Sequence, residues 1–150
     1  MKENVILVLI LLFCTSLICS FFSCSTTFTY PKDLVIEIGS GGGFTGLWSG
    51  YSLLADGAVI SWKGKKQGDN PKEYQKLNEE KVQKIWNLIE SSKAFEIKYQ
   101  EPGNLSKSLR ISAGGKQNFI LFDDSAGELK VSEYAKIYES IYQILEIKEN

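Results

Sequence analysis

Apolar and polar residues alternate in several short segments, which is the pattern of strands with one buried face. The first such segment is 34–38. Two further runs, 47–55 and 58–62, flank Asp56-Gly57. This dipeptide suits a tight hairpin because both turn residues adopt positive φ. The pattern therefore predicts one strand followed by a hairpin.

A second hairpin is predicted further along the chain. Apolar residues alternate over 109–113 and again over 118–122, and the diglycine at 114–115 supplies the turn between them. A short strand over 94–99 precedes this hairpin and ends at the turn sequence Pro-Gly-Asn of 102–104. These segments add three strands to the predicted sheet.

Two segments have the spacing of amphipathic helices. The first begins after Asn78, whose side chain can accept from a free helix N–H, and its apolar stripe is Val82, Ile85, Trp86 and Ile89. The second begins near Ser132, and its stripe is Tyr134, Ile137, Tyr138, Ile141, Tyr142 and Leu145.

The order of these elements predicts an α+β fold. We expect an antiparallel sheet of five to six strands, containing two hairpins, with both amphipathic helices packed on one face. A chain of 150 residues has room for one such domain, which we place at 33–147.

The N-terminal segment has a different character. A lysine at position 2 precedes a long apolar run that ends in small polar residues, which is typical of a secretory signal peptide over 1–23. The residues Phe21-Phe22-Ser23-Cys24 resemble a bacterial lipobox. This resemblance implies cleavage between Ser23 and Cys24 and lipidation of Cys24.

The sequence thus predicts a lipoprotein with a lipidated tether over 24–32, anchored in a membrane of the cell envelope outside the cytoplasm. Which membrane holds it stays open. Two alternatives also stay open: an uncleaved signal anchor, and plain secretion after cleavage at another position.

Charge and composition exclude several kinds of site. The chain has 17 basic and 18 acidic residues, so it lacks the basic surplus of a nucleic-acid binder. It has no histidine, which removes Ser-His-Asp catalysis and most zinc sites. All three cysteines lie at or before Cys24, so the domain has no thiol chemistry. We predict neither a metal site nor a cofactor.

A glycine-rich loop follows the first strand and is the candidate partner-binding site. Its spacing is formally that of a dinucleotide-binding loop, but a strand rather than a helix follows it, so we reject that interpretation. It either only connects two strands or presents its phenylalanine to a partner. The loop residues are Ser40, Gly41, Gly42, Gly43, Phe44, Thr45 and Gly46.

The same segment carries a resemblance to a known family. Ser40 to Gly46, after an N-terminal strand, resembles a segment near the start of emfourin-type inhibitors of thermolysin-like metalloproteases. It is also similar to small bacterial lipoproteins with a Gly-Gly-Gly-Phe-Thr-Gly segment, an Asp-Gly turn and a Pro-Gly-Asn turn. The lipobox and the tryptophan-containing strands depart from the emfourin pattern.

These features favour a membrane-anchored protein-binding module, similar to a protease inhibitor, that is not an enzyme. Its partners would be the membrane, through the lipid, and a protease or another envelope protein. Two alternatives remain. One is an envelope enzyme using two of its carboxylates as acid and base, drawn from Asp56, Asp123, Asp124 and Glu128. The other is a structural envelope protein without a discrete ligand.

Overall fold

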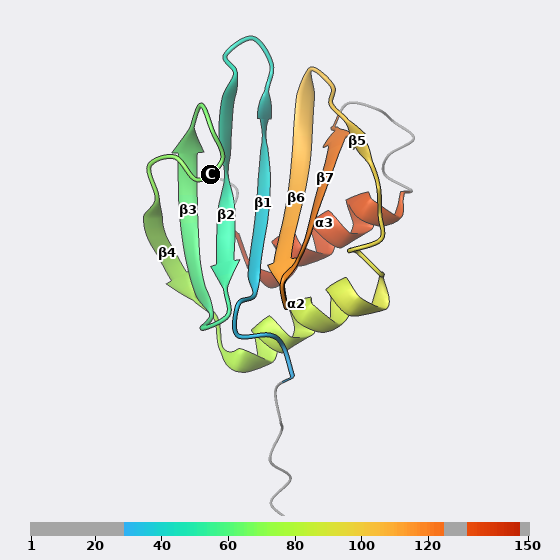
Figure 1. Ribbon diagram of the computed structural model, residues 1–150. Coiled ribbons are helices and arrows are strands. Elements are labelled where there is room, and N and C mark those ends of the chain that lie inside the picture. Colours follow the sequence, from blue (N-terminus) through green and yellow to red (C-terminus); the bar gives the residue numbers. More distant parts are fainter. Residues whose placement is uncertain (1–28, 125–131, 148–150) are drawn as a thin grey trace, which may run out of the picture.

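A computed structural model describes residues 29–124 and 132–147, which form one seven-stranded sheet beside two helices (Figure 1). The strand order is β4-β3-β2-β1-β6-β7-β5, and all neighbours are antiparallel except β5 and β7. The strands are β1 Val35–Gly42, β2 Leu47–Leu54, β3 Ala58–Gly64, β4 Lys72–Lys76, β5 Gln100–Glu101, β6 Leu105–Ala113 and β7 Lys116–Asp123.

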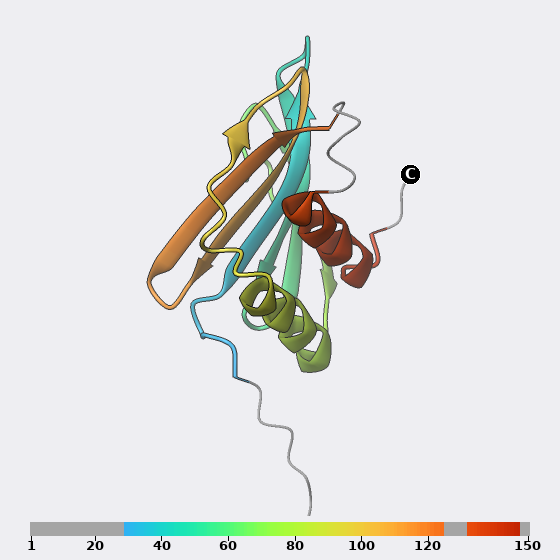
Figure 2. The ribbon, with the colours of Figure 1, turned by 90° about the vertical axis from the view of Figure 1, so that its right-hand side faces the viewer.

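Both described helices cover the same face of the sheet, as the edge-on view in Figure 2 shows. They are α2, Glu79–Ser91, and α3, Glu133–Ile144. Asn78 caps α2 by accepting from the Lys81 N–H at 3.0 Å, and Ser132 caps α3 by accepting from the Ala135 N–H at 3.4 Å. The predicted helices and their start signals are therefore confirmed.

The core lies between the sheet and the helices. Apolar residues at paired positions of β1, β2, β6 and β7 point toward α2 and α3, because residues opposite one another in a sheet share a face. Each fully buried large side chain contributes about 1.5–3 kcal/mol through its removal from water. The central members are Ile36, Ile38, Leu53, Ile85, Ile89, Leu109, Ile111, Ile120, Phe122 and Ile141.

The predicted strand over 94–99 is wrong. Residues up to 96 form turns after α2, and only Gln100–Glu101 pairs with β7. A side chain from the sheet binds this segment instead: the Asn118 amide donates to the carbonyls of Ala94 at 2.7 Å and Ile97 at 2.9 Å. These backbone acceptors thus need no neighbouring strand.

The strand count also exceeds the expected five to six, because β4 lies within a segment that carries no alternation. Four of its five residues are exposed, since it is an edge strand that pairs only with β3. The position of β4 is set by pairing with β3, which includes a bulge at Val59/Ile60.

The face of the sheet away from α2 and α3, here called the distal face, has its own packing. The Trp62 ring is 3% exposed and lies over Gly39 and Gly50, the residues paired across β1 and β2. The loop after β3 folds back over this face, where the Gln67 amide donates to Ser108 at 2.6 Å and accepts from Arg110 at 3.2 Å.

Candidate functional site

The predicted glycine-rich loop contains the turn between β1 and β2, which projects from one end of the sheet (Figure 1). Gly42, Gly43 and Gly46 have φ of +99°, +63° and +60°, values that favour glycine. The Gly43 N–H donates to the carbonyl of Asn104 at 2.5 Å, which ties the turn to the segment before β6. The backbone conformation at these three positions therefore favours glycine over other residues.

Apolar side chains are exposed around this turn. Phe44 is 107% exposed, the highest value among the large apolar residues, while Leu47 and Leu105 are 41% and 53% exposed. Gly42 pairs with both leucines, one on each side, so the two flank the base of the turn. We call Gly42 to Leu47 together with Leu105 the hairpin tip. It presents an apolar surface with no covering element among the described residues.

Three of the predicted loop residues belong to β1, which ends at Gly42. Ser40 and Gly41 lie within β1, paired on both sides with β2 and β6. Gly41 packs on the distal face, where an added Cβ would lie 2.8 Å from the ring of Trp48. Ser40 faces the helices instead. The candidate segment thus divides into a strand end and the exposed tip.

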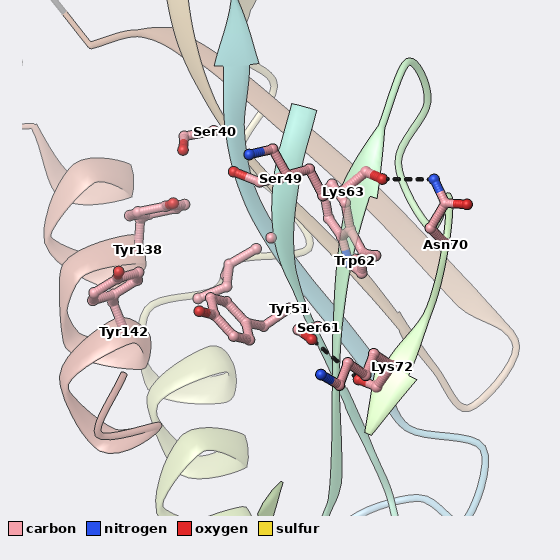
Figure 3. A pocket seen from close by; sticks show the side chains of 12 residues that line it. Ser40, Ser49, Tyr51, Ser61, Trp62, Lys63, Asn70, Lys72, Tyr138 and Tyr142 are labelled. Carbon is pink, nitrogen blue, oxygen red and sulfur yellow. Dashed lines mark hydrogen bonds between the residues drawn. The ribbon is translucent and has the colours of Figure 1, made fainter. Parts of the chain in front are cut away.

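A groove lies beside the tip, between α3 and the half of the sheet formed by β1 to β4, here called the outer half. The sequence did not predict it. The groove encloses about 780 Å³ and is open to solvent on one side. Figure 3 shows Tyr138 and Tyr142 projecting from α3 toward Tyr51 of β2, with serine hydroxyls along the sheet wall. Its lining residues are Ile38, Ser40, Ser49, Gly50, Tyr51, Ser61, Trp62, Lys63, Asn70, Lys72, Tyr138 and Tyr142.

The three tyrosines of the groove influence one another. Burial raises the pKa of Tyr138 well above its usual value, and nearby groups including Tyr142 and Tyr51 raise it further. Burial also raises the pKa of Tyr51, as do Tyr74 and Tyr142. The phenols of Tyr51 and Tyr138 therefore stay protonated at neutral pH, and each can both donate and accept a hydrogen bond.

The groove carries positive charge. Lys63 and Lys72 line it and form no ion pair with any carboxylate of residues 29–124 or 132–147. Lys107, which pairs with Ser40 across β1 and β6, is different: it contacts Asp124 at 2.9 Å and Glu139 at 2.7 Å. Burial alone would lower the pKa of Lys107, but hydrogen bonds to these carboxylates raise it. Lys107 is thus neutralised, whereas Lys63 and Lys72 are not.

The structure does not bring all the candidate acid–base carboxylates together. Asp56 lies in the turn after β2, where it accepts from the Ala58 N–H at 3.0 Å. Asp123 and Asp124 lie at the opposite end of the sheet, close to the hairpin tip. Glu128 lies outside the described residues. Within the described ranges, no three Asp, Glu, Cys or His side chains gather as a metal site.

The predicted signal peptide and its processing site, Ser23 and Cys24, also lie outside the described residues. Counting only 29–124 and 132–147, no helix is both long and apolar enough to cross a bilayer. The nearest described part is attached to the domain: the Thr29 N–H donates to Gln83 of α2 at 2.7 Å, and Tyr30 packs against the core.

One sequence signal does mark the groove. Ser40, Ser49 and Ser61 occupy positions that face the helix layer, where the strand pattern leads one to expect apolar residues. Polar residues at inward positions indicate that water or a ligand reaches that part of the face.

The fold and these two features define an α+β domain with an exposed apolar hairpin tip beside a hydroxyl-lined, basic groove. In comparisons with known proteins, the sequence matches no protein-family model and no curated protein.

Proposed function

We propose that this protein is a cell-envelope lipoprotein, anchored through Cys24, that binds another protein through its hairpin tip. The observation that supports this most is Phe44, whose side chain is fully exposed on a turn built from glycine. A phenylalanine ring that stays in water gains no burial free energy on folding, whereas contact with a partner would bury it.

The surroundings of Phe44 suit an interface. Leu47 and Leu105 extend the apolar surface, and Gly43 and Gly46 let a partner approach the backbone closely. Burial of the phenylalanine ring at the centre of an interface contributes about 2 kcal/mol or more.

The hairpin tip lies at the end of the sheet opposite the N-terminal segment, through which the protein would be attached to the membrane. Asp33 binds the turn between β6 and β7, at the end of the sheet opposite the tip. A chain tethered through its N-terminal segment would therefore present Phe44 away from the membrane (Figure 1). This geometry favours a protein partner over insertion of the tip into the anchoring membrane.

The resemblance of Ser40 to Gly46 to emfourin-type inhibitors suggests a first partner to test, a thermolysin-like metalloprotease. We would measure its inhibition by the full chain and by the variants Phe44→Ala and Phe44→Leu. We expect the inhibition constant to rise about 30-fold in Phe44→Ala, which corresponds to about 2 kcal/mol. Phe44→Leu, which keeps most of the apolar area, is the matched control and loses much less.

Thermal unfolding of the same variants separates binding from folding. Because Phe44 makes no buried contact, Phe44→Ala leaves the melting temperature nearly unchanged. If the protease is not inhibited, the same pair of variants is compared in pull-downs from envelope extract. A partner bound equally by Phe44→Ala and the natural chain would overturn the proposal, as would a large loss of stability without a loss of binding.

A further inference from the structure

The groove between α3 and the outer half of the sheet has a lining that the fold does not require. Around Ile36 the helix-facing side of the sheet is apolar, with Leu53 and Ile111 beside it. At the groove this side changes to serine at Ser40 and Ser49, whose hydroxyls form no hydrogen bond with any described residue. From this lining and its charge, we propose that the groove binds an anionic oligosaccharide.

The hydroxyl groups support a sugar ligand. Ser40, Ser49 and Tyr51 on the sheet face Tyr138 and Tyr142 on α3 (Figure 3). Each hydroxyl can donate and accept, so the lining matches a ligand whose own groups do both, which is the chemistry of a sugar. A purely apolar ligand would leave the hydroxyls of Ser40 and Ser49 without partners, at a cost of about 1–3 kcal/mol each.

The aromatic rings support it independently. Tyr138 and Tyr142 lie nearly parallel, with an interplanar angle of 18° and centroids 6.3 Å apart. Tyr51 lies across the groove and is held by Tyr74, with centroids at 5.0 Å. Rings fixed in this way offer apolar surface against which the C–H faces of a sugar pack.

The charge determines the kind of sugar. Lys63 and Lys72 lie on the sheet side of the groove, Lys63 paired with Ser49 and Lys72 with Ser61. None of the 12 lining residues is a carboxylate, so the two ammonium groups attract carboxylate or phosphate groups on the ligand. The volume of about 780 Å³ is within the usual range for a small-molecule site, about 300–1,000 Å³.

The test is calorimetric titration of the full chain, kept in a polyoxyethylene detergent that contains no sugar. Four probes are compared: a galacturonic acid tetrasaccharide, a glucose tetrasaccharide carrying a phosphate, the neutral glucose tetrasaccharide, and inorganic phosphate. We expect saturable binding of at least one charged tetrasaccharide. The preferred charged probe then tells whether carboxylate or phosphate is recognised.

Matched charge variants connect the binding to the groove. Lys63→Gln/Lys72→Gln should weaken the charged tetrasaccharide about tenfold or more. Lys65→Gln/Lys66→Gln removes the same charge from the neighbouring loop, outside the lining, and should change affinity less than about twofold. Ser49→Tyr, which fills the groove, should abolish binding, with the circular dichroism spectrum reporting whether it still folds.

Several results would overturn the inference. They are equal binding of the neutral tetrasaccharide, full competition by inorganic phosphate at equal concentration, equal losses in the two lysine variants, or no binding by any charged probe. Phe44→Ala is expected to keep the sugar affinity, because the ring is not part of the lining. That variant makes a failure of this inference distinguishable from a failure of the proposed function.

Discussion

The contact between Trp62 and the glycines of the distal face gives a prediction that runs against simple propensity. Alanine in place of a strand glycine usually stabilises by about 0.5–1 kcal/mol, because glycine loses more freedom on folding. At Gly39, however, an added Cβ would lie 2.5 Å from Cη2 and 3.1 Å from Cζ2 of Trp62. We therefore expect Gly39→Ala to destabilise the protein.

The size of the effect follows from the two opposing contributions. Forcing a methyl group into a closed contact costs about 1–3 kcal/mol, against an entropic gain of about 0.5–1 kcal/mol, so the net loss reaches about 2.5 kcal/mol. In a Trp62→Ala background the ring is absent, and the nearest remaining atom is the carbonyl oxygen of Ser49 at 3.1 Å. Gly39→Ala should then cost clearly less than it does beside the ring, because only the contact with the Ser49 oxygen remains.

The free energy of unfolding is measured in urea by far-ultraviolet circular dichroism, on a chain of residues 25–150. Four proteins are compared: the natural sequence, Gly39→Ala, Trp62→Ala and the double variant. Gly50→Ala is the matched control, because its Cβ would clash with the backbone oxygen of Ile38 and would destabilise in either background. An equal cost of Gly39→Ala with and without the Trp62 ring would refute the reasoning, since the ring would then not be the cause.

Three further predictions concern the anchor, the core and one pKa. Cys24→Ala should abolish labelling by radioactive palmitate and release the protein from membranes; continued labelling would contradict the lipobox assignment. Trp86→Ala should cost about 3–5 kcal/mol in urea unfolding, because the ring is 7% exposed in the core; a loss below about 1 kcal/mol would contradict its burial. The pKa of Asp33 is lowered from 3.8, because its carboxylate accepts from the N–H groups of Gly114 and Gly115. The stability that Asp33 contributes is thus present above its unfolded pKa and lost as the pH falls through the lower folded pKa. Asp33→Ala should therefore show a smaller drop in melting temperature between about pH 5 and pH 2 than the natural chain, and an equal drop would contradict the assignment.

Local signals in the sequence were sufficient for the two hairpins and the described helices. Asp56-Gly57 does lie in a tight turn, but positive φ at both residues was wrong, because Gly57 has φ +85° and Asp56 does not have a positive φ. The stripe from Val82 to Ile89 is buried as its spacing indicates. In each case the residues that define the element are close in sequence, so pattern and structure depend on the same neighbours.

The parts that sequence missed depend on distant residues. Lys72–Lys76 becomes a strand only because β3 is beside it, and Ala94 is held by the amide of Asn118 rather than by a strand. The groove was missed for the same reason, since its lining comes from β1, β2, β3, β4 and α3. Phe44 could be singled out from the sequence, because a large apolar residue between glycines is recognisable without knowing any distant contact.

The pairing of β1 with β6 has a consequence for how fast the protein folds. Val35 pairs with Ser112 and Gly42 with Leu105, whereas the other antiparallel pairs join strands that are consecutive along the chain. The two halves of the sheet can thus form early from local contacts, but joining them requires closing a long loop that contains α2. We expect this loop closure to limit the folding rate. Substitutions at the paired residues of β1 and β6 would then slow refolding, while those in β4 would mainly speed unfolding.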